Sequence, residues 1–199
     1  MGQVLKGSNA GGGSNLFRYN TFLAGNSSFI PISGFNSIQT VSYPSGTGGD
    51  VVFSNIPSDY RHLQIRAFVR DTRADTTATW FLQFNGDTGT NYSYQGMEQN
   101  GTSIGAVSSL SQNSIQGINA AAQTGSSRFA AAVIDIFDTN QTNKYKTVTY
   151  QSGFSNNGST ARLYTAAGTW RNTSAITSIA FKPNTGFAQY SHIALYGIA

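Results

Sequence analysis

The chain has 199 residues, of which 10% are charged and 13% aromatic, and its formal net charge is +4. This length suits one domain with a sizeable core, and the absence of cysteine excludes a disulfide framework and thiolate metal sites. Its 12 Lys and Arg residues are spread thinly, so we expect no nucleic-acid partner. No apolar run approaches the roughly 18 residues of a membrane span, and no signal peptide is evident, so we expect a cytoplasmic origin and no membrane partner.

Residues 1–36 are predicted to form an extended N-terminal arm. The first part is rich in glycine and cannot bury enough apolar surface to offset the cost of ordering it. The second part carries large apolar side chains, which need a surface to cover them. They either cover an edge of their own domain or dock on another subunit. The interface candidates are Leu16, Phe17, Tyr19, Phe22, Leu23 and Phe29.

Strand patterns begin near Ser37 and include Val51–Phe53. In the next segment Leu63, Ile65, Ala67 and Val69 point one way and polar residues mostly point the other, which is the period of a half-buried strand. Trp80, Leu82 and Phe84 repeat this pattern and lead into Asn85-Gly86, the pair that best accepts positive φ. This combination predicts a β-hairpin whose return strand contains Tyr92 and Tyr94.

The stretch from Gln99 to Ser127 is small and polar, with isolated apolar residues. We expect a long, weakly specified surface connection here, with a short helix over Ile115–Ala122 as the alternative. Strand patterns resume at Phe129–Phe137, which is apolar on both faces and so belongs near the middle of a sheet. Further strands are predicted at Lys144–Gly153, Ala161–Trp170, Ile176–Pro183 and His192–Ile198.

These patterns predict an all-β fold for residues 37–199. Serine, threonine and asparagine are abundant and compete with the helical hydrogen-bond ladder, and no long helical period is present. Eight to ten short strands separated by turn clusters indicate an antiparallel β-sandwich, most simply with jelly-roll connectivity.

Residues for enzymatic chemistry are few. Asp135 is the one carboxylate predicted on a strand, and a glycosidase needs two that face one sugar. His62 and His192 stand beside strand starts without a second ligand at a recognisable spacing, so we expect each to bond to backbone. We therefore predict no catalytic residue, no cofactor and no metal, and a protein that is not an enzyme.

Two kinds of binding site are weighed against simpler roles. Asp71, Asp75 and Asp87 could hold Ca²⁺ at one end of the sandwich, but aspartate is also a common turn residue, which is the role we favour. Exposed aromatic rings could stack on sugar rings, although cores and subunit interfaces use the same residues more often. The glycan-contact candidates are Trp170, Tyr92 and Tyr94, followed by Tyr164 and Tyr190.

Four stretches carry a resemblance to a known family. They are IPSDYRHLQI at Ile56–Ile65, FNGDTGTNYS at Phe84–Ser93, WRNTSAITSI at Trp170–Ile179 and SHIALYGI at Ser191–Ile198. Together they make the chain from about Val52 to Ala199 resemble a family of bacteriophage virion structural proteins. The resemblance implies a β-sandwich displayed on the particle, either on the head or on the tail.

From this resemblance and the apolar arm, we expect a non-enzymatic capsid decoration (cement) protein that docks on the shell through its arm. The implied partners are the major capsid protein or other virion proteins, together with further copies of the chain, of which a trimer is favoured. The implied location is the virion, and we expect the protein to be made in the host cytoplasm. The alternative is a tail or tail-fibre module that binds a glycan on the host surface.

Overall fold

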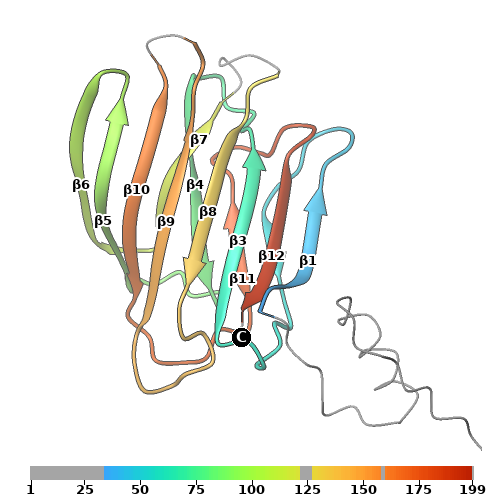
Figure 1. The fold of residues 1–199 in the computed structure, drawn as a ribbon, viewed down its shortest axis with the longest axis vertical. Helices are drawn as coiled ribbons and strands as arrows, with labels where there is room; N and C mark the ends of the chain where they lie inside the picture. Colours follow the sequence, from blue (N-terminus) through green and yellow to red (C-terminus); the bar gives the residue numbers. More distant parts are fainter. Residues whose placement is uncertain (1–33, 122–126, 158–159, 199) are drawn as a thin grey trace, which may run out of the picture.

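The structure is a computed structural model, and it describes residues 34–121, 127–157 and 160–198. These residues form two antiparallel β-sheets that pack together as the predicted β-sandwich (Figure 1). The described part of the chain contains no helix, and hence none long and apolar enough to cross a membrane. Nearly all of the predicted arm lies outside the described residues, as do its interface candidates Leu16, Phe17, Tyr19, Phe22, Leu23 and Phe29.

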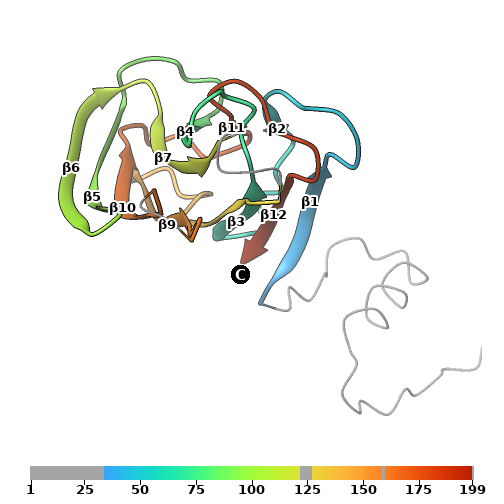
Figure 2. The ribbon, with the colours of Figure 1, turned by 90° about the horizontal axis from the view of Figure 1, so that it is seen from above.

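The larger sheet has eight strands, and Figure 2 shows it from above with β6 at one end and β1 at the other. Their order across the sheet is β1 (Asn36–Ser42), β12 (His192–Ile198), β3 (His62–Val69), β8 (Ala130–Ile136), β9 (Lys146–Phe154), β10 (Arg162–Trp170), β5 (Tyr92–Asn100) and β6 (Ser103–Gln112). The smaller sheet has four strands, in the order β2 (Val51–Phe53), β11 (Ile179–Lys182), β4 (Thr77–Phe84) and β7 (Ile115–Ala120).

The core lies between the two sheets and follows the period-2 patterns. In β3, Leu63, Ile65 and Val69 are fully buried, as the alternation predicts. In β4 the Trp80 ring is fully buried, with its centroid 5.2 Å from that of Tyr150 and 5.4 Å from that of Phe181. Strand β7 passes directly against this ring, and a Cβ added at Gly117 would lie 2.1 Å from it. Glycine at this position therefore allows β7 to approach the tryptophan.

The Asn85-Gly86 turn is confirmed, but the hairpin predicted around it is wrong. Both residues have positive φ, 51° and 68°, and the Asp87 N–H donates to the Phe84 carbonyl at 2.9 Å. However, β4 pairs with β7 and β11, whereas β5 pairs with β6 and β10. The turn is thus a corner where the chain leaves the smaller sheet for the larger one.

The region predicted as a long connection, Gln99–Ser127, forms the two strands β6 and β7. The predicted connection is therefore wrong for Ser103–Gln112 and Ile115–Ala120, and the alternative helix is wrong for Ile115–Ala120. Strand β6 pairs with β5 from Asn100 opposite Ser103 to Tyr94 opposite Ser109, and β7 pairs with β4. Most of β6 is exposed on both faces, so no alternation of apolar and polar residues marks it in the sequence. With these additions the described residues contain twelve strands, more than the eight to ten predicted.

The free edge of β7 is closed by side chains from the opposite sheet. The Tyr150 hydroxyl donates to the carbonyl of Gln116 at 2.7 Å, and the Ser152 hydroxyl accepts from the N–H of Ile118 at 3.2 Å. Both side chains come from the inward side of β9. Backbone groups that would otherwise be left without partners beside the core are therefore satisfied across the sandwich.

We predict that Tyr150→Phe lowers the free energy of unfolding by about 1–3 kcal/mol, because it leaves the Gln116 carbonyl without its donor while preserving the ring. Urea unfolding measures the change. The matched control is Tyr145→Phe, since Tyr145 is 54% exposed and should change stability by less than about 0.5 kcal/mol. Equal stability of the two variants would contradict this role for Tyr150.

Candidate interaction surface

The outward side of β9, β10, β5 and β6 carries no charged residue, and we call it the uncharged face. These four strands contain three charged residues, Lys146, Arg162 and Glu98, and the alternation of the strands places all three on the inward side. The outward positions hold threonine, glutamine, serine, alanine and glycine, with large apolar side chains at Leu163, Met97 and Ile104.

Each of the three inward charges has polar partners. The Lys146 ammonium donates to the carbonyls of Gln141, Lys144 and Thr173, the last at 3.1 Å. Arg162 Nη1 lies 2.6 Å from Glu98 Oε1, and both side chains are partly exposed. Because these charges belong to the inward side, the outward side of the same strands remains neutral.

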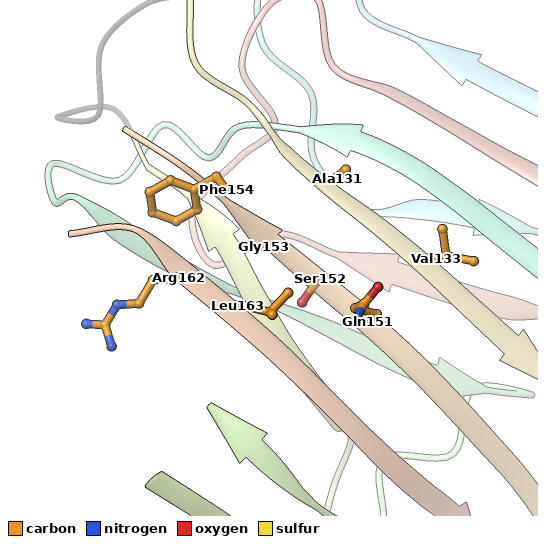
Figure 3. Close-up of a pocket in the computed structure, with 8 residues that line it drawn as sticks. All are labelled: Ala131, Val133, Gln151, Ser152, Gly153, Phe154, Arg162 and Leu163. Carbon is orange, nitrogen blue, oxygen red and sulfur yellow. The ribbon is translucent and has the colours of Figure 1, made fainter. Parts of the chain in front are cut away.

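A shallow hollow lies where the uncharged face meets β8. Two adjoining depressions, of about 300 and about 550 Å³, share Val133 and Gln151 in their linings. In Figure 3 the Gln151 side chain lies between those of Val133 and Leu163, and that of Arg162 points away. Gly153 also lines the hollow. A Cβ added at this position would lie 2.4 Å from the Arg162 carbonyl oxygen. The close approach of β10 thus requires a residue without a side chain.

The lining of the hollow suits contact with another molecule and offers little for catalysis. Val133 and Leu163 are 41% and 42% exposed, and Gln151, Thr149 and Thr165 add neutral hydrogen-bonding groups. Asp135 is the single carboxylate in the lining. It accepts a hydrogen bond from Gln64 Nε2 at 2.6 Å, and the Oε1 of the same Gln64 side chain accepts from Arg66 Nε at 2.8 Å. No second carboxylate lines the hollow to form the pair that a glycosidase needs.

The described chain begins on the outward side of the larger sheet. The ring of Phe35 stacks on that of Tyr196 with centroids 4.8 Å apart, and the Arg66 guanidinium lies 5.0 Å from the Phe35 centroid. Tyr196 belongs to β12 and Arg66 to β3, so Phe35 lies over two strands of this sheet. The described chain therefore starts on the same side of the larger sheet as the uncharged face, from which β8 separates it.

The prediction that Trp170, Tyr92 and Tyr94 contact a glycan is wrong for this structure, because all three rings are buried. Their exposed fractions are 1%, 0% and 6%. The Trp170 indole N–H donates to Asp87 at 2.7 Å, and the Tyr92 hydroxyl accepts from the Phe84 N–H at 2.9 Å. Tyr164 is also in the core, where burial raises its pKa to about 12, whereas Tyr190 is exposed.

The three loop aspartates do not converge on one cation site. Buried Asp71 accepts the backbone N–H groups of Arg73, Asn184 and Thr185, and Asp75 accepts that of Thr76. Asp87 accepts from Trp170, from Asn91 and from the N–H of Gly89. Partial burial raises the pKa of Asp87, but these donors outweigh it, and the net effect is a lowered pKa. Each carboxylate organises a loop, as expected for turn aspartates.

The two histidines also lie apart from any ligand cluster in the described ranges. His62 Nδ1 accepts the backbone N–H of Asp138 at 3.0 Å, as the sequence suggests, while His192 is exposed at the start of β12. Residues 34–121, 127–157 and 160–198 contain no group of three or more His, Cys, Asp or Glu residues that could hold a metal ion.

Asp138 forms a separate charged cluster at the loop after β8. Its carboxylate lies 2.6 Å from Arg61 Nε and 2.7 Å from Lys144 Nζ. The hydrogen bonds from Lys144 and Arg61 lower the pKa of Asp138 to about 2. The cluster joins the turn before β3 to the loop that follows β8 and lies outside the uncharged face.

Sequence reasoning missed the uncharged face, although part of its signal was present. Alternate positions of β9 read Thr147, Thr149 and Gln151, without a charge. The face becomes visible only when the register places Gln151 opposite Thr165, and Thr165 opposite Met97.

Comparison of the chain with protein-family models, with curated proteins and with solved structures finds no match.

We predict that stability becomes less favourable as the pH falls from about 4 towards about 2, in part because Asp138 is protonated there. A carboxyl with an ordinary pKa of 3.8 when unfolded and about 2 when folded stabilises the fold above both values and loses this contribution as the pH falls. Thermal unfolding of the wild type and of Asp138→Asn between about pH 5 and pH 2 should show a gap that closes at low pH. A gap that stays constant would contradict the assignment.

Proposed function

We propose that the protein is a non-enzymatic structural component of a bacteriophage particle, a capsid decoration (cement) protein that is bound to the shell through residues 1–36. Its partners are the major capsid protein or other virion proteins, and it associates with further copies of itself. The proposal combines the resemblance carried by four stretches of the sequence with the surface chemistry of the larger sheet.

The uncharged face is the observation that carries the proposal. About a quarter of the residues in a typical soluble protein are charged, and the central part of a protein interface is depleted of them. Leu163, Met97 and Ile104 are 42%, 57% and 77% exposed on this side. Covering such side chains contributes about 25 cal/mol for each Å² of apolar surface removed from water, without the cost of burying a charge.

The order of the strands supports a jelly roll, which viral capsid domains use among other proteins. With the hairpins β5–β6 and β9–β10 set aside, the sheets read β1-β12-β3-β8 and β2-β11-β4-β7. Two nested Greek keys produce this order. The two hairpins then widen one sheet only, and they provide all of the uncharged face.

The described start of the chain lies on the same side of the larger sheet as the uncharged face. Phe35 stacks on the outward side of β12, and β3 and β8 lie between β12 and the first strand of that face. A partner that covers this side of the sheet can contact both the uncharged face and the start of the described chain. The glycan-binding alternative is not favoured, since Trp170, Tyr92 and Tyr94 are buried.

Particle binding tests the proposal directly. Mass spectrometry of purified particles of the phage that encodes the chain should detect the protein. A chain truncated to residues 34–199 should remain folded by circular dichroism but should no longer sediment with particles that lack the native protein. Absence of the protein from the particles would overturn the proposed function, and full binding by the truncated chain would overturn the role of the arm.

A second experiment tests the face itself. Gln151→Arg and Gln95→Arg add a charge at exposed positions whose neighbours across the sheet are uncharged. Each should leave thermal stability unchanged and weaken particle binding by about tenfold or more, because the charge would be buried without a partner. Val52→Arg is the matched control, as Val52 is 55% exposed on the smaller sheet. Equal binding by all three variants would place the shell contact elsewhere.

A further inference from the structure

The four outer edges of the two sheets differ in how they are closed. Strand β2 has three residues, and the free edge of β7 is bonded by Tyr150 and Ser152. Strand β1 has a bulge between Ser37 and Gln39, which interrupts its register. Short strands, bulges and side-chain cover are the devices by which native proteins prevent pairing with other chains.

Strand β6 lacks these devices along most of its length. It has ten residues, none of them charged and none proline, and its register with β5 is regular from Ser103 to Ser109. The one bulge of this pair lies at the far end, near Tyr92. Both views of the ribbon show no described segment beyond β6 (Figures 1 and 2). An open and neutral edge of this length, with a regular register, is a template for another strand.

We propose that two copies of the chain associate through antiparallel pairing of β6 with β6, so that the two larger sheets become one continuous sheet. This inference goes beyond the proposed function and does not require it. A two-fold contact uses the same surface on both subunits, and any charge on the edge would meet a like charge near the axis. The absence of charge in Ser103–Gln112 removes that repulsion.

The side chains beside the edge fit a second copy. Ile104 and Leu110 are 77% and 65% exposed, and Met97 lies on the neighbouring strand, opposite Ala106. Pairing across a two-fold axis perpendicular to the sheet places the uncharged faces of the two copies on the same side. The apolar groups near each edge then cover one another, and the charge-free surface continues across the junction.

Pairing of β6 with the β1 edge of another copy is the competing arrangement, and it is disfavoured by the bulge in β1. Such head-to-tail pairing would also generate open chains of molecules, whereas pairing of β6 with itself closes after two. The two-fold contact differs from the trimer expected from the sequence.

Disulfide cross-linking tests the contact, and the chain suits this method because it has no cysteine. Single cysteines are introduced into the full-length protein at successive positions from Ile104 to Ser109, including Gly105, where an added Cβ meets no atom within 4 Å. In a two-fold antiparallel pair, only the residue next to the two-fold axis lies opposite the same residue of the other copy. A residue two positions away from the axis is four residue spacings from its counterpart, so the two sulfurs would be roughly 13 Å apart, too far for a disulfide. Cross-linking should therefore peak sharply at one position.

The controls are Val52→Cys on β2 and Thr40→Cys on β1, which should cross-link slowly with themselves and with every β6 variant. Sedimentation should give the mass of two chains for the wild type. The double variant Ala106→Lys with Ser108→Lys should weaken dimerisation by about tenfold or more with unchanged thermal stability. Val52→Lys should dimerise normally.

Three results would overturn the proposal: a monomer at all concentrations, equal cross-linking at all β6 positions, or preferential cross-linking between Thr40→Cys and a β6 variant. Particle binding is scored separately on the same variants. A monomeric protein that still binds particles would reject the β6 contact and leave the decoration role intact. A protein that dimerises through β6 but is absent from particles would support the β6 contact and reject the decoration role.

Discussion

The fold depends on one corner, where the chain passes from the smaller sheet to the larger one at Asn85–Asn91. The carboxylate of Asp87 accepts hydrogen bonds from the Trp170 indole, from Asn91 and from the Gly89 N–H. The Tyr92 hydroxyl accepts from the Phe84 N–H, so the last residue of β4 is bonded to the first residue of β5. Asn85 fixes the neighbouring loop by accepting the N–H groups of Thr177 and Ser178. These bonds fix the position of the two sheets relative to each other, although the sheets share no strand. The buried rings of Trp170 and Tyr92 pack between them.

Sequence periodicity predicted where the strands lie in the sequence better than it predicted which strands pair with one another. The alternation in β3 and in β4 identified the buried side chains, because burial on one face leaves a period of two in the sequence. The partner of β4 could not be read in this way, since β11 lies about a hundred residues further along the chain. A strong local turn at Asn85-Gly86 instead suggested a hairpin with the next strand. Strand β6 was missed for a different reason, because a strand exposed on both faces leaves no period.

The candidate surface, too, depends on contacts between residues that are far apart in the sequence, which the sequence pattern does not reveal. Large aromatic residues such as Trp170 serve in cores and in sugar sites alike, and sequence alone does not separate the two roles. Trp170 is buried here, and its indole is bonded to Asp87, a residue far from it in the sequence. The uncharged face is likewise a property of register across several strands. Within each strand the absence of charge on one face is hard to see in the sequence. Lys146, Arg162 and Glu98 directly adjoin neutral residues in the sequence, and they are separated from them only because neighbouring residues of a strand point to opposite faces.

The hydroxyl groups of Tyr150 and Ser152, which cover the edge of β7, have a consequence for the size of any assembly. A sandwich with several open edges is multivalent for strand addition, and multivalent units grow into fibrils or precipitates as their concentration rises. Among the edges of the two described sheets, β7 is covered, β2 has three residues and β1 is interrupted, which leaves β6 as the one edge open to strand addition. A unit with one such edge stops growing as soon as that edge is used. An assembly formed by strand addition is then limited to two molecules.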